Sequence, residues 1–208
     1  MSHYFPPVSL QRSSPDRETC LEILCRYDVP SHIVAHSQRV AQVTVTLGGL
    51  LARSGLCLDL ALAEAGALLH DIAKMISIER GGDHAAEGAE IVSSLGFPEI
   101  GEIVRRHVHL GREDDDFSRI TEVVLVNYAD KRVRHTEVVD LEDRFDDLVD
   151  RYGITAEKRR RIQLLRAQAL RQEAHIFQRL RQDPSCLNRL NRFEPHIFLE
   201  EDTCLLQP

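Results

Sequence analysis

The sequence predicts an all-α protein, a single-domain helical bundle. In most segments beyond residue 15 apolar residues recur at three- and four-residue spacing, and no segment shows the clean two-residue alternation of a half-buried strand. The chain has 208 residues, of which 43% are hydrophobic, so it can bury one substantial core. It contains no internal repeat and no low-complexity tract, which favours one packed body of helices.

Capping residues, glycines and prolines set the expected helix boundaries. Asp16 is a candidate N-cap for the first helix and Ser31 for the second, which ends at Gly55. The expected helices cover residues 16–27, 31–55, 59–75, 84–95, 98–108, 119–133 and 156–180. Three segments result, a flexible N-terminal arm, one helical domain and a C-terminal tail, over residues 1–15, 16–182 and 183–208.

Charge and cysteine content narrow the class of protein. The net charge is −7, with 33 acidic against 26 basic residues, which argues against a protein built mainly to coat nucleic acid. The five cysteines are odd in number and form no CxxC pair. No signal peptide and no long apolar run is recognisable, so we expect a cytoplasmic protein with reduced thiols and without a membrane partner.

Potential metal ligands fall on the inward faces of five expected helices. His70 and Asp71 stand side by side in the apolar stretch "ALLHDIAKM", where burial of a carboxylate without a partner is costly. The complete set is His36, His70, Asp71, His84, His107 and Asp130. One inward histidine alone is usually a hydrogen-bonded core residue. Six such groups cannot easily satisfy one another, and one or two divalent cations would satisfy them all.

The order of these residues resembles that of a known family. His36, then His70-Asp71, then Asp130 reproduce the H…HD…D order of the HD-domain metal-dependent phosphohydrolases, and "HDIAK" is close to the "HDIGK" of one branch. The flanking "HSQRVA", "HAAEGAEIV" and "NYADK" are similar as well, and the resemblance covers about residues 30–135. It implies one metal ion on His36, His70, Asp71 and Asp130, and a bridge through Asp71 to a second ion on His84 and His107.

The resemblance also implies an activity. It suggests hydrolysis of a nucleotide or a related phosphoester or phosphoanhydride by a metal-activated hydroxide, and the two-metal subgroup includes enzymes that cleave dinucleoside polyphosphates. The resemblance favours iron or manganese, although the ligand types also suit cobalt, nickel or zinc. The expected partner is a small phosphorylated substrate, and a homo-oligomer is left open.

Other residues are candidates for contacts with substrate. Lys74, one turn beyond His70, could assist catalysis at a phosphate oxygen, or could merely extend to solvent. Arg39, one turn from His36, and Arg112 are candidate phosphate contacts, and the alternative is that both are ordinary surface charges. His109 is a candidate substrate contact or a support for a ligand, since His107 has the better helical phase.

Two other functions remain open at this point. Some HD-type folds hold a mixed-valent di-iron site that activates oxygen. A non-catalytic nucleotide sensor is the weaker alternative, because none of the six ligand positions is lost. The basic segment 156–180 keeps an apolar stripe and follows an acidic segment that could pair with it, so a packing helix is expected there and an RNA surface is not.

Overall fold

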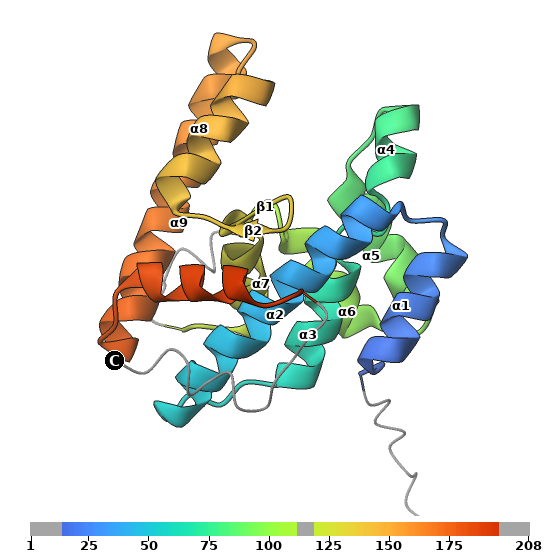
Figure 1. Cartoon of the computed structure of the whole chain (residues 1–208). Coiled ribbons are helices and arrows are strands. Elements are labelled where there is room, and N and C mark those ends of the chain that lie inside the picture. The colour runs from blue at the N-terminus through green and yellow to red at the C-terminus, as the bar shows by residue number, and fades with distance from the viewer. Residues whose placement is uncertain (1–13, 112–118, 196–208) are drawn as a thin grey trace, which may run out of the picture.

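The fold is almost entirely helical, which confirms the predicted class (Figure 1). The computed structural model describes residues 14–111 and 119–195. In chain order these residues form α1 Arg17–Arg26, α2 Ser31–Arg53, α3 Leu60–Leu69, α4 Lys74–Arg80, α5 His84–Ser94, α6 Pro98–Arg106, α7 Glu122–Lys131, β1 Val133–Arg134, β2 Glu137–Val138, α8 Leu141–Tyr152, α9 Ala156–Leu180 and the 3-10 helix Pro184–Arg192. The antiparallel pair of β1 and β2 is too short for a recognisable alternation in the sequence.

Side-chain caps explain where several helices begin. The Asp16 carboxylate accepts a hydrogen bond from the Thr19 backbone N–H at 2.8 Å, which confirms the predicted N-cap of α1. Asp59 and Asp83 cap α3 and α5 in the same way. The prediction for α2 was wrong by one residue. Ser31 is its first helical residue, and the preceding proline occupies the cap position without a side-chain bond.

The segment 70–73 interrupts the helix that was expected to run from residue 59 to residue 75. Here the backbone closes three-residue turns, from the Ile72 N–H to Leu69 O at 3.1 Å and from the Lys74 N–H to Asp71 O at 3.0 Å. The carbonyl of Ala67 in the last turn of α3 accepts a bond from His70 Nδ1 at 2.7 Å. The apolar pattern continues through the break, so the sequence did not reveal it.

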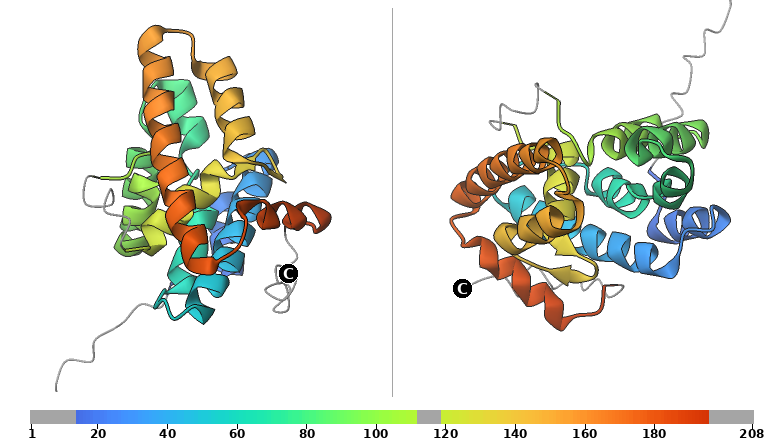
Figure 2. Two further views of the ribbon diagram at one scale, coloured as in Figure 1. Left: turned by 90° about the vertical axis from the view of Figure 1, so that its left-hand side faces the viewer. Right: turned by 90° about the horizontal axis from the view of Figure 1, so that it is seen from above.

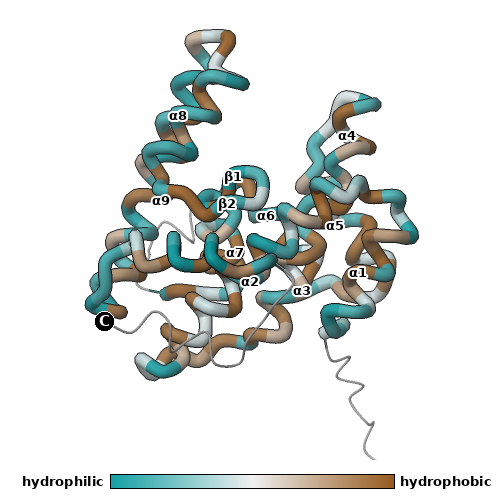
Figure 3. The backbone as a smooth tube through the Cα atoms, viewed as in Figure 1, coloured by the Kyte–Doolittle hydropathy of each residue, from teal (hydrophilic) through white to brown (hydrophobic). Residues whose placement is uncertain are grey.

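The hydrophobic core lies among α2, α3, α6 and α7, with α1 and α5 packed outside them (Figures 1 and 2). α3 is strongly apolar, whereas the projecting α8 and α9 are largely hydrophilic (Figure 3). A Cβ atom at Gly66 would lie 2.6 Å from Ile103 Cγ2, so this glycine allows α3 and α6 to pack closely. Among the described residues no helix combines the length and apolar character that a bilayer span requires.

Two helical projections rise from the body on either side of the short hairpin (Figure 1). One is the antiparallel pair of α8 and α9, and the other is α4. The basic α9 pairs with the acidic α8 as expected, since Arg166 lies 3.1 Å from the Glu142 carboxylate and 3.5 Å from that of Asp146. The acidic segment is therefore a helix packed against α9. The metal-ligand candidates His36 and Asp71 line a cavity together with residues of α4 and α8.

Buried arginines fix residues 184–193 to the body. Arg132 is fully buried and donates to Tyr128 Oη at 2.7 Å, to Glu173 Oε2 at 3.0 Å and to the Pro184 carbonyl at 3.3 Å. Leu187 and Leu190 of the 3-10 helix are buried. This part of the expected tail therefore packs on the domain. The remainder of that tail, and residues 1–13 of the expected arm, lie outside the described residues.

A candidate metal centre

The six predicted ligand side chains come together, although they start from widely separated elements. His36 lies on α2, His70 and Asp71 in the turn after α3, His84 at the start of α5, His107 at the end of α6, and Asp130 on α7. One ligand atom each of His36, His70 and Asp71 lie within 4.8 Å of one another, and the same holds for Asp71, His84 and His107. Asp71 belongs to both groups, so we refer to them as the first and the second ligand group.

The two oxygens of Asp71 face different ligand groups. Oδ2 lies 3.4 Å from His70 Nε2 and 3.9 Å from His36 Nε2 in the first group. Oδ1 lies 3.5 Å from His84 Nε2 and 3.7 Å from His107 Nε2 in the second. Asp130 Oδ1 completes the first group, 3.2 Å from His36 Nε2. This is the placement that a carboxylate bridging two cations requires.

Backbone carbonyls orient three of the imidazoles. The Nδ1 atoms of His36, His70 and His107 lie 2.8, 2.7 and 2.6 Å from the carbonyl oxygens of His135, Ala67 and Val104. A carbonyl only accepts, so each Nδ1 donates, and a neutral ring then presents the lone pair of Nε2 to the cluster. This hydrogen bond on the far nitrogen is the usual support of a metal-binding histidine.

Unsatisfied buried atoms show that the six residues fit a divalent metal. Within the described part of the chain, His70 Nε2 and Asp71 Oδ1 are buried and have no hydrogen-bond partner, and both point into the cluster. His107 donates through Nδ1 to the Val104 carbonyl, so its Nε2 carries a lone pair, and His84 Nε2 lies within hydrogen-bond distance of it at 3.2 Å. Mixed imidazole and carboxylate donors of this kind suit a first-row transition metal.

Charges in the cluster perturb its pKa values strongly. Burial acts to lower the pKa of His70, but the carboxylates of Asp71 and Asp130 outweigh it and raise this pKa to about 10. Burial acts to raise the pKa of Asp71, but His70, His107 and Lys74 hold it well below its usual value. Burial and the neighbouring His107 lower the pKa of His84 to about 4. At neutral pH the carboxylates are therefore charged and His84 is neutral.

Metal binding should displace the proton of His70. Because the pKa of this histidine is about 10 in the metal-free protein, it carries a proton at pH 7 that a ligand must lose. We expect Mn²⁺ to release about one proton from this residue, and its apparent affinity to rise about tenfold per pH unit between pH 6 and 8. Calorimetric titration of chelator-stripped protein in buffers of different ionisation enthalpy measures both. A pH-independent affinity without proton release would contradict this account.

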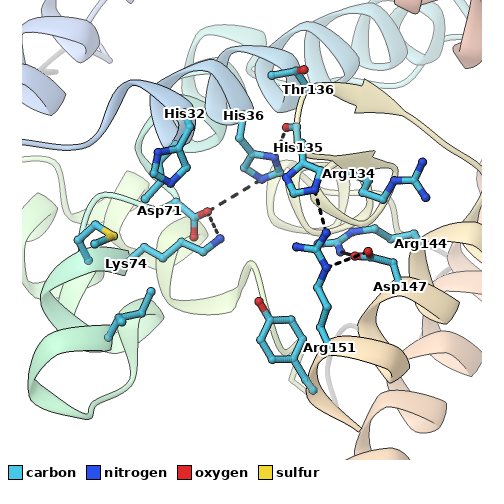
Figure 4. Close-up of a pocket in the computed structure, with 14 residues that line it drawn as sticks. His32, His36, Asp71, Lys74, Arg134, His135, Thr136, Arg144, Asp147 and Arg151 are labelled. Carbon is cyan, nitrogen blue, oxygen red and sulfur yellow. Dashed lines mark hydrogen bonds and ion pairs between the residues drawn. The ribbon is translucent and has the colours of Figure 1, made fainter.

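Lys74 contacts the cluster directly. Its Nζ atom lies 2.6 Å from Asp71 Oδ2, and its side chain is 38% exposed. Burial acts to lower its pKa, but Asp71 and Asp130 raise it, so the ammonium stays charged. Lys74 also lines a cavity of about 330 Å³ that opens beside His36 and Asp71 (Figure 4). The sequence left open whether Lys74 assists catalysis or merely extends to solvent, and this position favours a role at the site.

Two of the predicted substrate contacts lie elsewhere. The Arg39 guanidinium is buried and donates to the carbonyls of Thr136, Leu190 and Phe193, so it holds the hairpin and the C-terminal segment. Because α6 ends at Arg106, the chain turns after His107 and sends His109 toward α9, where it lies 3.4 Å from Arg161. Neither side chain lines the cavity beside Asp71 and Lys74, so the structure does not support a substrate contact by either residue. Arg112 lies outside the described residues.

Sequence reasoning missed the opposite wall of the cavity. Arg134, Arg144 and Arg151, together with His135 and Asp147, line it across from Asp71 and Lys74 (Figure 4). These residues lie in the β1–β2 hairpin and in α8, interleaved with acidic residues in the sequence. A run of mixed charge is ordinarily a solvated helix face, and only the return of the hairpin brings it to the ligand groups.

Comparisons with known proteins identify a matching family and several relatives. A family model of the HD domain matches residues 33–153. An uncharacterized protein of Methanocaldococcus jannaschii is 31% identical over 70% of this chain and 89% of its own length. A tRNA (cytidine(56)-2'-O)-methyltransferase of Thermoplasma volcanium is 27% identical over 61% of this chain, and Ribonuclease Y of Aquifex aeolicus is 36% identical over 50% of it. The matches span 40% and 17% of these two relatives. No solved structure matches.

Proposed function

The chain belongs to the HD-domain family, and on this premise we propose that it is a metal-dependent phosphohydrolase acting on a nucleotide or a related phosphoester. One observation carries the proposal. Two groups of ligand atoms share Asp71 beside a cavity that cationic side chains line. Phosphoryl transfer needs little from a protein beyond positioning and positive charge around the transferred group, and this arrangement supplies both.

The residues have separable roles in this proposal. Metal ions held by the two ligand groups, iron or manganese by preference, would supply an activated water and positive charge at the phosphoryl oxygens. Asp71 positions both groups at once, and the carbonyl bonds of His36, His70 and His107 keep their rings in place. Lys74, with a charged Nζ beside Asp71, is placed to bind a phosphoryl or leaving-group oxygen at the cavity.

The cavity supports a small substrate. Its volume of about 330 Å³ lies near the lower end of the range of small-molecule pockets, roughly 300–1,000 Å³. Tyr152 and Ile78 lie on its lining and are 56% and 68% exposed, so a flat apolar group such as a base could rest there. A nucleotide combines such a group with a phosphate, which metal ions held by the two ligand groups would bind.

Metal analysis and a phosphate-release assay test the proposal. Protein stripped with chelator and reloaded with Mn²⁺, Fe²⁺ or Zn²⁺ is given nucleoside mono-, di- and triphosphates, a dinucleoside tetraphosphate and a cyclic dinucleotide. We expect release of phosphate or nucleotide only after reloading. Oxygen uptake measured in parallel separates hydrolysis from the di-iron oxygenase alternative, because hydrolysis consumes no oxygen. A protein that binds metal but cleaves none of these compounds would contradict the proposal.

A second candidate substrate is a phosphodiester bond in RNA. The similarity to Ribonuclease Y favours it, although the match spans only 17% of that protein. The same ligand groups would serve either bond, so the distinction depends on the rest of the cavity. A short single-stranded RNA in the same assay distinguishes them, because an RNA substrate should be cleaved faster than any of the nucleotides.

A further inference from the structure

The wall of the cavity opposite the ligand groups carries unusually concentrated positive charge. Arg134 of β1 and both Arg144 and Arg151 of α8 line it, and Asp147 is the acidic residue on this same wall (Figure 4). Among the described cavity-lining residues, Asp71 on the other side is already surrounded by imidazoles and Lys74. The wall therefore has an excess of cationic groups that no lining carboxylate balances.

Asp147 holds two of these guanidinium groups without saturating them. Its carboxylate lies 2.9 Å from Arg151 Nε and 3.5 Å from Arg144 Nη1, the latter at the limit of a hydrogen bond. Among the described residues no hydrogen bond engages Nη2 of Arg144 or Nη1 of Arg151. The nearest carboxylate to Arg134 is the exposed Glu137, at 3.4 Å. Donors therefore remain for another anion.

His135 connects this wall to the first ligand group. Its carbonyl accepts the Nδ1–H of His36 at 2.8 Å, and its ring Nε2 lies 2.9 Å from Arg151 Nη2. The residue has a φ of 58°, a left-handed conformation in the turn between β1 and β2. One residue thus fixes a ligand imidazole and a wall arginine, so the spacing between the two sides of the cavity is defined by the hairpin.

We propose that Arg134, Arg144 and Arg151 bind a second phosphate group of the substrate, so that the site selects nucleotides with two or more phosphates over monophosphates. This inference rests on the proposed function, which places the first phosphate at the ligand groups. Guanidinium groups present paired donors that match two oxygens of one phosphate, and this wall offers three of them. A monophosphate held at the ligand groups would leave this wall without a phosphate to contact.

Equilibrium binding of ADP and AMP tests the inference independently of turnover. Calorimetry or a fluorescent-nucleotide competition assay is carried out on the full chain, both chelator-stripped and Mn²⁺-loaded. We expect ADP to bind at least about tenfold more tightly than AMP in the loaded protein, since an added charge-assisted contact is worth at least that factor. The Arg144→Gln and Arg151→Gln variants should each weaken ADP binding about tenfold or more and change AMP binding less than about threefold.

Control variants separate recognition from folding. Arg166→Gln removes an α9 arginine that pairs with Glu142 and Asp146 and does not line this cavity, so the ADP/AMP ratio should stay unchanged. Arg151→Lys keeps the charge but loses the paired donors, and it should recover part of the ratio. If Arg144→Gln does not fold, Arg134→Gln at the exposed edge of the hairpin gives the same test.

The outcomes distinguish the inference from the proposed function. Equal binding of ADP and AMP, or an ADP/AMP ratio that the arginine variants do not change, would overturn the inference even if phosphate release is observed. An arginine-dependent preference for ADP without any hydrolysis would support the inference and refute the hydrolase. Tighter arginine-dependent binding of a short RNA than of ADP would overturn the assignment to free nucleotides.

Discussion

Replacement of Asp71 by asparagine should abolish catalysis and remove the metal while the helices persist. The substitution keeps the size of the side chain but removes the one charge that both ligand groups share. Without it, the buried His70 and the nearby Lys74 lose their main counter-charge, and divalent cations would lose the ligand that the two groups share. Loss of residues that merely support metal ligands costs about 10- to 100-fold, so loss of this carboxylate should lower turnover at least about 100-fold.

Metal content by elemental analysis, phosphate release and far-ultraviolet circular dichroism check this prediction together. Asp146→Asn is the matched control, because Asp146 is an exposed carboxylate of α8 that pairs only weakly with Arg166. It should retain metal and activity. If Asp71→Asn keeps its metal and hydrolyses normally, the assignment of the shared carboxylate is wrong.

Replacement of Arg132 by methionine should be the most destabilising change outside the metal centre. Arg132 is fully buried, and its loss leaves the largely buried Glu173 without its cation and Tyr128 Oη without a donor. Breaking a buried ion pair by removal of one partner costs about 3–5 kcal/mol of unfolding free energy. The variant should also release the Pro184 carbonyl, and with it the start of the C-terminal 3-10 helix.

Urea unfolding followed by circular dichroism measures this loss. Arg166→Met is the matched control, because Arg166 pairs with two exposed carboxylates and should contribute about 0–1 kcal/mol. The double variant Arg132→Met/Glu173→Gln should recover part of the loss, since it removes the charge left behind. Equal effects of the two single arginine variants would show that the buried network contributes little.

The predicted ligand set could be read from the sequence because each residue is in phase with an apolar face of a helix that the sequence predicts. His36 shares the inward stripe of α2, and Asp130 that of α7, so helical periodicity alone directs them to the core. The resemblance to the HD family then grouped residues that periodicity leaves separate. The structure brings the side chains of all six residues together.

What sequence reasoning could not supply depends on contacts between distant segments. The helix break at His70 follows from a side-chain bond to a backbone carbonyl, which leaves the apolar pattern unchanged. Arg39 resembled a surface charge one turn from a ligand, yet residues 190–193 return from the end of the domain to accept its donors. The arginine wall arises in the same way, from a hairpin whose two strands span only two residues each.

The arginine anchors also make the stability of the body depend on residues 184–193. Arg39 and Arg132 are buried in the body, but several of their acceptors belong to Pro184, Leu190 and Phe193. A chain without those residues would leave buried donors of Arg39 without the Leu190 and Phe193 carbonyls, and would remove the Pro184 carbonyl from Arg132. Truncation after residue 183 should therefore lower the free energy of unfolding of the body, and urea unfolding of the truncated and the full chain measures the difference.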